Sequence, residues 1–247
     1  MKKIIELNNI SRDFHVGEET VHALREVSFS IKEGQFLTIM GKSGSGKSTL
    51  LNILGCLDKP TSGTYILDGT PVESMNKDQR AKIRNRKIGF VFQSYNLLAN
   101  TTAIENVELP LLYNSAISSK KRKELAIEAL ETVELGDRMF HKSNQMSGGQ
   151  MQRVAIARAL VNNPAVILAD EATGNLDTRT SFSILKLFQE LHREGRTIIF
   201  VTHNNDIASF CERNIVLRDG RIIDDKYNSN ILSASEALEN LPKEEEE

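Results

Sequence analysis

The chain has 247 residues, of which 40% are hydrophobic and 26% are charged, and its formal net charge is −2 at pH 7. This length is enough for one large domain, or for a domain with a substantial insertion. The near-balanced charge excludes the broad basic field that is typical of proteins that bind nucleic acid.

The sequence carries no signal for export or membrane insertion. Its first residues lack the apolar core of a signal peptide, and no run approaches the ~18 apolar residues of a membrane span. Cys56 and Cys211 lack CxxC spacing and are interpreted as buried thiols in a reducing compartment. We therefore expect a soluble, cytosolic protein that reaches a membrane only through a partner.

The N-terminal part of the chain alternates apolar and polar residues, which is typical of antiparallel strands separated by turns. The expected strands are Ile4–Ile10, Val27–Ile31 and Thr64–Leu67. The expected turns are at Gly17, Glu33-Gly34 and Asp68-Gly69.

Four short and nearly unbroken apolar runs are expected to be parallel strands that are buried on both faces. These runs are Phe36–Met40, Ile88–Phe92, Ala165–Ala169 and Thr197–Val201. The residues that follow them are Gly41, Gln93, Asp170 and Thr202-His203. Because ligands bind beyond the carboxyl ends of strands in open parallel sheets, we expect these residues to meet at one edge.

Between Gln93 and Ser147 the pattern becomes helical, and residues 95–163 are interpreted as a helical insertion. In Lys120–Leu135, for example, apolar residues follow one helical face and charges the other. After Gly220 the apolar content falls. Residues 226–247, which end in four glutamates, are expected to form a flexible acidic tail, with a partner-binding role as the alternative.

The segment Gly41–Ser48 fits the phosphate-binding pattern GxxxxGK[ST], between an apolar strand and a helical run at Thr49–Leu57. Its glycines allow backbone N–H groups to surround phosphate oxygens, and the helix N-terminus adds positive partial charge. Lys47 can reach the β- and γ-phosphates, and the Ser48 hydroxyl can ligate Mg²⁺. The alternative is a glycine-rich turn, which would fit the pattern in roughly one chain of this length in a hundred. The expected nucleotide-binding residues are Gly41, Ser43, Gly44, Ser45, Gly46, Lys47, Ser48 and Thr49.

An adjacent acidic pair, Asp170 and Glu171, ends the third apolar run. Asp170 at that place can hold Mg²⁺ through water, and Glu171 can face an attacking water. The alternative is a solvated turn. Gln93 and His203 also follow strands, but by spacing alone a single glutamine there usually carries no function and a single histidine is more often structural.

Ser147 is a good N-cap for a helical run at Met151–Val161. The exposed N–H groups of such a helix start can bind an anion. The alternative is a capped helix with a flexible start.

Met146-Ser147-Gly148-Gly149-Gln150 begins 105 positions after Gly41. Ser-Gly-Gly-Gln at this place resembles the signature of ATP-binding cassette (ABC) ATPases, and the resemblance covers about residues 1–225. It implies an α/β fold with a RecA-like P-loop NTPase core, a mixed or parallel sheet, an N-terminal antiparallel β-subdomain and an α-helical insertion. Residues 1–225 would be a single domain, with residues 226–247 as its tail.

The resemblance also implies roles for the motif residues. Asp170 matches the Walker B aspartate, Glu171 the general base and His203 the switch histidine that donates to the γ-phosphate. Gln93 matches the glutamine that completes the Mg²⁺ shell. Phe14, which is 27 residues before Gly41, matches an aromatic that stacks on adenine, with a core phenylalanine as the alternative.

In this family, the signature of one subunit closes over the ATP that the phosphate loop of another subunit holds. The resemblance therefore assigns Ser147, Gly148, Gly149 and Gln150 to the nucleotide of a second subunit. Gly174–Asp177 resembles the D-loop of that interface.

Three segments resemble one branch of the family closely: Phe14–Leu24, Leu51–Pro60 and Glu105–Leu111. This branch holds the ATPases of lipoprotein-release, macrolide-export and antimicrobial-peptide-resistance systems, with the cell-division ATPase as a relative. Two residues depart from the usual pattern: Met146 replaces leucine, a tolerable change, and Ala172 replaces the proline that would restrict Glu171.

We therefore expect a transporter ATPase that binds ATP and Mg²⁺, forms a homodimer and powers an integral membrane permease with few spans and a large external domain. It would lie on the cytoplasmic face of the membrane, without binding nucleic acid. The alternatives are a soluble ABC ATPase that acts on ribosomes or DNA, and a P-loop kinase or GTPase. The absence of a second cassette and the presence of Ser147–Gln150 argue against them.

Overall fold

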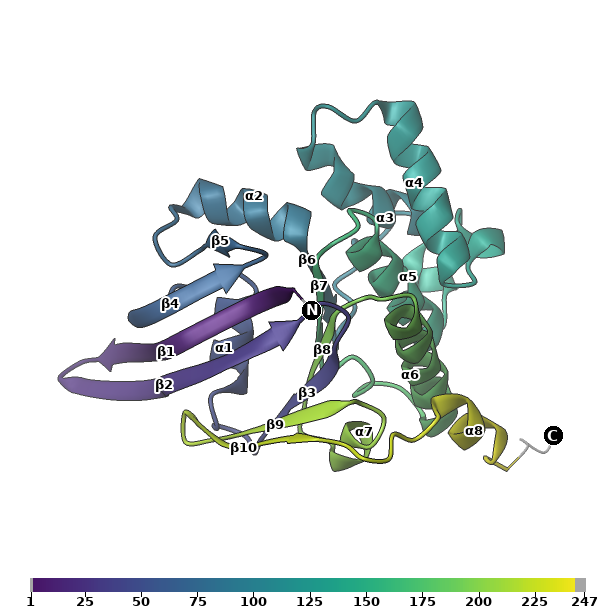
Figure 1. The fold of residues 1–247 in the computed structure, drawn as a ribbon. Helices are drawn as coiled ribbons and strands as arrows, with labels where there is room; N and C mark the ends of the chain where they lie inside the picture. The colour runs from purple at the N-terminus through teal and green to yellow at the C-terminus, as the bar shows by residue number, and fades with distance from the viewer. Residues whose placement is uncertain (1, 243–247) are drawn as a thin grey trace.

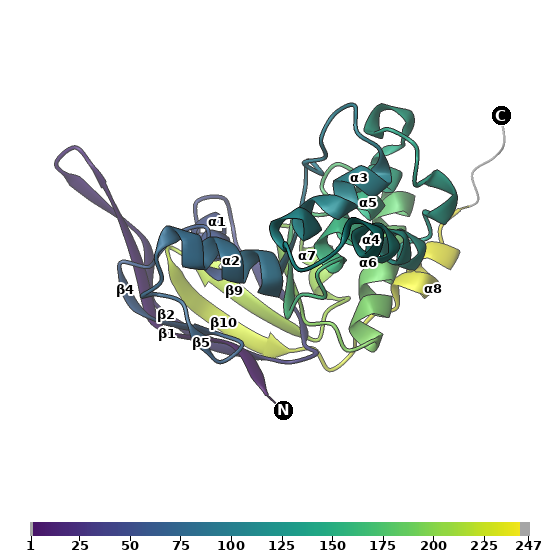
Figure 2. The same cartoon turned by 90° about the horizontal axis from the view of Figure 1, so that it is seen from above.

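The computed structural model describes residues 2–242, which form two β-sheets with helices packed around them (Figure 1). The smaller, antiparallel sheet lies on one side of the molecule, and most helices lie on the other side. The six-stranded sheet runs between these two parts (Figures 1 and 2).

The six-stranded sheet has the order β10-β9-β3-β8-β7-β6. All neighbours from β9 to β6 run parallel, and only β10 is antiparallel to β9. Its strands are β3 (Phe36–Met40), β6 (Ile88–Phe92), β7 (Val166–Asp170), β8 (Ile198–Thr202), β9 (Arg213–Arg218) and β10 (Arg221–Tyr227). The four apolar runs expected from the sequence are therefore confirmed as adjacent parallel strands.

The unbroken apolar character of these strands follows from burial on both faces. In β7, Val166 and Leu168 pack into the core shared with the antiparallel sheet. Their neighbours Ile167 and Ala169 pack into the core shared with the helices. Since side chains alternate between the faces of a strand, both faces need apolar residues here.

The antiparallel sheet has the order β2-β1-β4-β5. Its strands are β1 (Lys3–Val16), β2 (Glu19–Lys32), β4 (Ser62–Leu67) and β5 (Thr70–Pro71). The first two strands are longer than the sequence predicts, and they form a hairpin that projects from the molecule (Figure 2).

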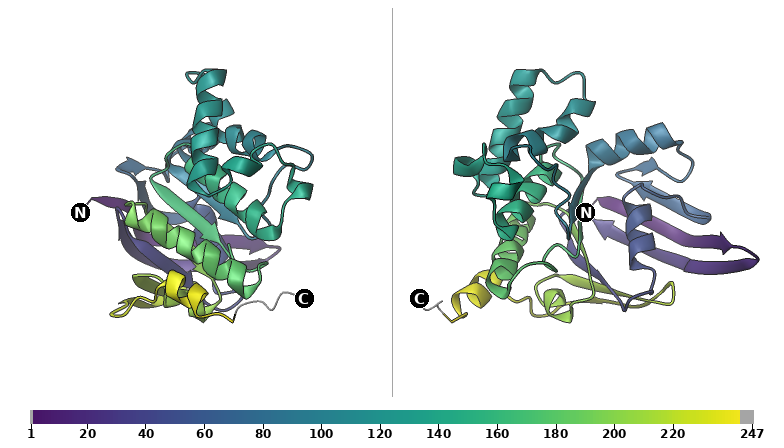
Figure 3. Two further views of the ribbon diagram at one scale, coloured as in Figure 1. Left: turned by 90° about the vertical axis from the view of Figure 1, so that its right-hand side faces the viewer. Right: turned by 180° about the vertical axis from the view of Figure 1, so that it is seen from behind.

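The helices are α1 (Lys47–Leu54), α2 (Lys77–Lys87), α3 (Ala103–Glu108), α4 (Ser119–Thr132), α5 (Gly148–Leu160), α6 (Thr178–Arg193), α7 (Asn205–Ala208) and α8 (Ala234–Glu239). Short 3-10 helices are η1 (Leu109–Tyr113), η2 (Gly136–Arg138) and η3 (Ser143–Gln145). Helices α3 to α5 form the expected helical part (Figure 3). Within residues 2–242, no helix combines the length and the apolar character that a membrane crossing requires.

The C-terminal part differs from the expected flexible tail. Strand β10 runs to Tyr227, and α8 packs on α6 with Ala234 fully buried (Figure 3). The Gln189 side chain of α6 fixes this segment, because it accepts from the Ala234 N–H and donates to the Leu232 carbonyl. Residues 226–242 thus belong to the folded unit, while the acidic residues 243–247 lie outside the described residues.

Candidate active site

The loop Gly41–Ser48 connects the end of β3 to the start of α1 and wraps tightly around its own backbone. Gly44 and Gly46 have φ of 79° and 104°, in the left-handed region that favours glycine. A Cβ at Gly46 would lie 2.6 Å from the Ala23 carbonyl oxygen, and one at Gly41 would lie 2.3 Å from the Leu217 oxygen. Larger residues at these positions would therefore push the loop away from the strands that support it.

Inside this loop, the Lys47 ammonium donates to the carbonyls of Gly41 and Lys42 at 2.6 and 3.0 Å. The lysine is thereby folded across the loop that its own helix begins. Ser45 is 4% exposed, and its hydroxyl has no hydrogen-bond partner among the described residues. Ser48 and Thr49 follow in the first turn of α1.

Asp170 is the last residue of β7, two strands away from β3 in the sheet. Burial raises the pKa of its carboxyl, the neighbouring Glu171 raises it further, and Lys47 lowers it. A nearby cation would offset this cost of burial. The end of β7 and the phosphate loop are thus electrostatically coupled, as expected for strand ends that meet at one edge.

Glu171 and His203 are brought together at this edge. The His203 Nδ1 atom lies 2.5 Å from the Glu171 Oε1 atom. Glu171 has φ of 49°, and its N–H donates to the Val201 carbonyl of β8 at 2.9 Å. Glu171 is therefore held by one hydrogen bond of its backbone and one contact of its carboxylate. Both are present although residue 172 is alanine and not proline.

Gln93 lies just after β6 and is joined to Asn175, which is 82 positions away. The Gln93 Nε2 group donates to Asn175 Oδ1 at 3.0 Å, and the Asn175 amide donates back to the Gln93 carbonyl at 3.2 Å. A Cβ at Gly174 would lie 2.7 Å from Gln93 Nε2, so glycine allows this approach. The sequence offered no signal that could pair these two residues.

Ser147 caps α5 through a reciprocal capping box. Its hydroxyl accepts from the Gln150 N–H, and the Gln150 side chain accepts from the Ser147 N–H. Gly148 packs against the Tyr95 hydroxyl, and a Cβ at Gly149 would lie 2.5 Å from Thr180 Cγ2. The predicted cap is confirmed, and a side chain at either glycine would force a neighbouring side chain of the same chain to shift.

Phe14 lies on β1, and its side chain is not in the core, because the residue is 38% exposed. The Arg12 guanidinium lies over its ring, 4.4 Å from the centroid. Arg12 is in turn fixed by Asp58, with Nε and Nη2 donating to the two carboxylate oxygens at 2.8 and 3.2 Å. The alternative of a core phenylalanine is wrong.

The fold and these strand ends define a P-loop nucleoside-triphosphatase of α/β architecture. A family model described as ABC transporter matches residues 24–174. The chain therefore belongs to the ABC transporter ATP-binding family.

Relatives support this assignment along nearly the whole chain. An uncharacterized ABC transporter ATP-binding protein of Thermotoga maritima is 55% identical over 222 residues, which cover 90% of this chain and 94% of that protein. The macrolide export ATP-binding/permease protein MacB of Brucella melitensis is 46% identical over 242 residues, or 98% of this chain and 37% of MacB.

A solved structure is also similar. It is the dimeric post-hydrolysis state of the ATP-binding cassette MJ0796 of Methanocaldococcus jannaschii, bound to ADP and Pi. Its TM-score is 0.82 at 48% identity, with 90% of this chain and 98% of that chain covered. The chain is thus an ATP-binding and ATP-hydrolysing subunit of an ABC transporter, and the branch expected from the sequence is confirmed.

Proposed function

We propose that two copies of this chain bind two ATP molecules with Mg²⁺ between them, close, and thereby move a membrane permease. The observation that carries this proposal is the contact between Glu171 and His203 beside Asp170. A hydrolytic base, a γ-phosphate donor and a metal-binding carboxylate need this proximity to act on one phosphoryl group.

The residues near the phosphate loop suit Mg²⁺, which prefers oxygen ligands and keeps several waters. Ser48 supplies a hydroxyl and Asp170 a carboxylate whose burial makes a neighbouring cation favourable. The Gln93 Nε2 group is used by Asn175, which leaves its amide oxygen for the metal. Bound Mg²⁺ would neutralise phosphate charge, and Ser48, Gln93 and Asp170 would hold it.

Glu171 would accept the proton of the attacking water, and His203 would donate to the γ-phosphate. The contact between them supports both roles, because a carboxylate orients an imidazole through one ring nitrogen and leaves the other free. His203 has a 70% exposed side chain, so the other nitrogen is open to a ligand. Lys47 would bind the β- and γ-phosphates.

Phe14 would stack on adenine, since its ring is partly exposed and has Arg12 over it. The ring offers no hydrogen bond, so base selectivity would be weak. Asp58 would keep Arg12, and with it the ring, in place.

The residues Ser147–Gln150 would bind the ATP of the second copy. The start of α5 is partly exposed, and the capping box uses the N–H groups of Ser147 and Gln150 but not those of Gly148 and Gly149, which could bind an anion. A homodimer would then contain two complete sites, because this chain carries both Ser147–Gln150 and Glu171. Gly174–Asp177 would run along the interface, which fits the contact of Asn175 with Gln93.

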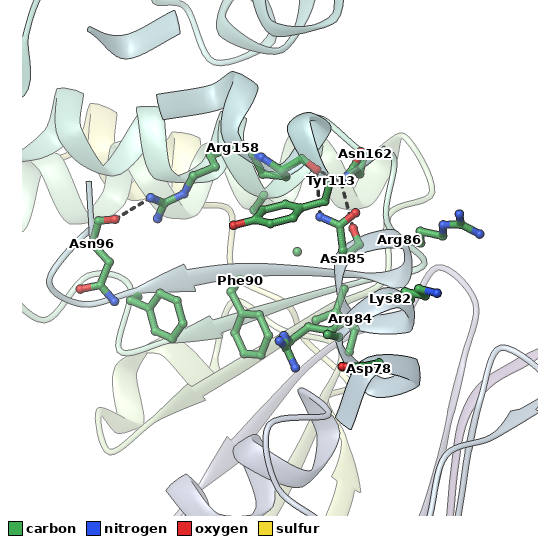
Figure 4. A pocket seen from close by; sticks show the side chains of 16 residues that line it. Asp78, Lys82, Arg84, Asn85, Arg86, Phe90, Asn96, Tyr113, Arg158 and Asn162 are labelled. Atoms are coloured by element: carbon green, nitrogen blue, oxygen red, sulfur yellow. Dashed lines mark hydrogen bonds between the residues drawn. The ribbon is translucent and has the colours of Figure 1, made fainter. Parts of the chain in front are cut away.

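The permease would dock in a groove of about 990 Å³ between α2, β6 and the helical part (Figure 4). Basic side chains line it, among them Lys82, Arg86 and Arg158, against the single acid Asp78. Phe90 and Tyr113 add apolar area, and Tyr113 is 83% exposed. We expect a short helix from a cytoplasmic permease loop that carries acidic and apolar side chains.

The permease would have few spans and a large external domain, as in the lipoprotein-release, macrolide-export and peptide-resistance systems. This chain spans 37% of MacB, which combines ATP-binding and permease parts in its name. A permease part of the same kind would act with this chain. The chain would then lie on the cytoplasmic face of the membrane.

Trapping of a dimer tests the proposal. The Glu171→Gln variant should lose turnover and keep ATP binding, so that ATP with Mg²⁺ shifts it from monomer to dimer in size exclusion. Wild-type turnover in this variant would show that Glu171 is not the base. Purification of a tagged chain from membranes should also recover a multi-domain permease, whereas recovery of ribosomes would contradict the transport role.

A further inference from the structure

The backbone that follows Gln93 has an uncommon conformation. Tyr95 and Asn96 are consecutive residues with φ of 58° and 50°. This left-handed region is unfavourable for residues other than glycine, and most of all for a bulky residue such as tyrosine. Contacts from outside the turn must therefore stabilise it.

Arg158, on the last turn of α5, makes those contacts. Its Nη1 group donates to the Asn96 carbonyl at 2.6 Å (Figure 4). Its Nη2 group donates to the Tyr95 carbonyl at 2.7 Å. The planar guanidinium can bind two adjacent acceptors at once, and its charge strengthens both bonds. Burial lowers the pKa of Arg158, which nevertheless stays protonated in proteins.

The same turn is attached to the beginning of α5. The Tyr95 hydroxyl would lie 2.9 Å from a Cβ at Gly148, so the ring packs directly against the first residue of the helix. On its other side, Gln93 is bonded to Asn175. The position of Gln93 is thus set between Asn175 and the two attachments to α5.

We propose that Arg158 is a positioning residue for ATP hydrolysis, which holds the turn at Tyr95 and Asn96 and so keeps the Gln93 amide at the phosphate edge. This inference rests on the proposed role of Gln93 at Mg²⁺. The Arg158 guanidinium is bonded to two backbone carbonyls, so its effect on the nucleotide would be indirect. It acts by fixing the backbone two and three residues after Gln93.

The two hydrogen bonds from Arg158 to the carbonyls of Tyr95 and Asn96, which we call the Arg158 clamp, also lie beside the proposed permease site. Arg158 and Asn96 both line the groove, with Tyr113 beside them (Figure 4). A carboxylate of the docked helix would compete with the two carbonyls for the guanidinium. Binding of the permease in the groove would then change the position of Gln93 through the Arg158 side chain.

The Arg158→Gln variant of the full chain tests the inference. Glutamine cannot donate to both carbonyls with the arginine geometry, so kcat should fall about tenfold or more while the KM for ATP stays within about twofold. The matched control is Arg153→Gln. Arg153 is also on α5 and donates to a backbone carbonyl, that of Val133 at the end of α4, at 3.0 Å, away from the Gln93 turn. Its kcat should stay near that of the wild type.

Two further variants separate positioning from general stability. Asn96→Gly in the Arg158→Gln background should restore part of kcat, because glycine adopts the left-handed turn without strain. Adding Arg158→Gln to Gln93→Ala should cause no further loss, because residues that act as one unit are not additive.

The outcomes distinguish failure of the positioning role of Arg158 from failure of the proposed role of Gln93. An unchanged kcat in Arg158→Gln, or an equal loss in Arg153→Gln with a lowered Tm in both, would overturn the positioning role while Gln93 keeps its own. A normal kcat in Gln93→Ala would overturn the proposed role of Gln93, and this inference with it. Full additivity of the two substitutions would also contradict the positioning role.

Discussion

The His203 Nδ1 atom lies 2.5 Å from the Glu171 Oε1 atom, although the two residues are 32 positions apart in the chain. They meet because each follows one of two neighbouring parallel strands, β7 and β8. Glu171 is partly shielded, with a side chain 20% exposed, whereas the His203 side chain is 70% exposed. The Glu171 carboxylate is therefore held by the fold, whereas most of the His203 side chain faces solvent.

The first prediction concerns this pair. His203→Ala should lower kcat by about 10²-fold, because the carboxylate loses its partner and the γ-phosphate loses a donor. Glu171→Gln should lower it more, and the double variant should resemble Glu171→Gln, because the two act together. Phosphate release measures kcat, and nucleotide titration should give an unchanged affinity. Independent, multiplicative losses would contradict a shared function.

The second prediction tests the start of α5 without damaging it. Ser147→Asp keeps the N-cap but adds a carboxylate where we propose that the ATP of the second copy binds. Ser147→Asn caps equally well and adds no charge, so it is the matched control. ATP binding by the monomer should be normal in both variants. Dimer formation and turnover should be lost in the aspartate variant and largely kept in the asparagine variant.

This pair of variants replaces a more obvious choice, Gly149→Asp. A Cβ at Gly149 would lie 2.5 Å from Thr180 Cγ2, so any side chain there disturbs packing between α5 and α6. Loss of turnover in Gly149→Asp could then result from this disturbed packing and would not show that Gly149 contacts a second subunit. Equal loss of dimer formation in Ser147→Asp and Ser147→Asn would count against the proposed charge contact.

The sequence predicts the strands and the cap of α5 well, because local pattern determines both. Apolar runs of five residues identify β3, β6, β7 and β8, and the parallel arrangement then places their polar end residues at one edge. The N-cap role of Ser147 is likewise local, since its hydroxyl accepts from the N–H of Gln150, three residues away.

Contacts between distant segments have no such signal. The pair Gln93 and Asn175 depends on how two loops pack, and the clamp of Arg158 on Tyr95 depends on the path of α5. Helix α8 was missed for a related reason. It is short, with only three apolar residues, and it is held by the buried Ala234, whose N–H donates to the Gln189 side chain.

The third prediction concerns that C-terminal segment. Ala234→Asp should reduce the free energy of unfolding by about 3 kcal/mol, because it buries a carboxylate without a partner. Glu239→Gln on the exposed side of the same helix should change it by less than about 0.5 kcal/mol. Urea unfolding followed by circular dichroism gives both values. A small effect of Ala234→Asp would mean that α8 does not contribute to the stability of the folded chain.

The last prediction concerns the two cysteines, which are buried and unpaired. Burial raises the pKa of the Cys56 thiol from 9.0 to about 12, and burial also raises the pKa of Cys211. Between pH 9 and 12, the unfolded chain therefore loses thiol protons that the folded chain keeps. The free energy of unfolding should fall as pH rises through this window, by about 1.4 kcal/mol per pH unit for each thiol.

Urea unfolding at pH 8 and pH 10 measures that fall. The Cys56→Ala/Cys211→Ala variant should show a smaller decrease between the two pH values, although its stability at pH 8 is lower because methyl-sized cavities remain. Iodoacetamide should modify the wild type slowly at pH 8 and rapidly in urea, since only an exposed thiolate reacts. Rapid modification of the folded chain would show that these thiols are reachable by solvent, and the predicted pH dependence would then lose its cause.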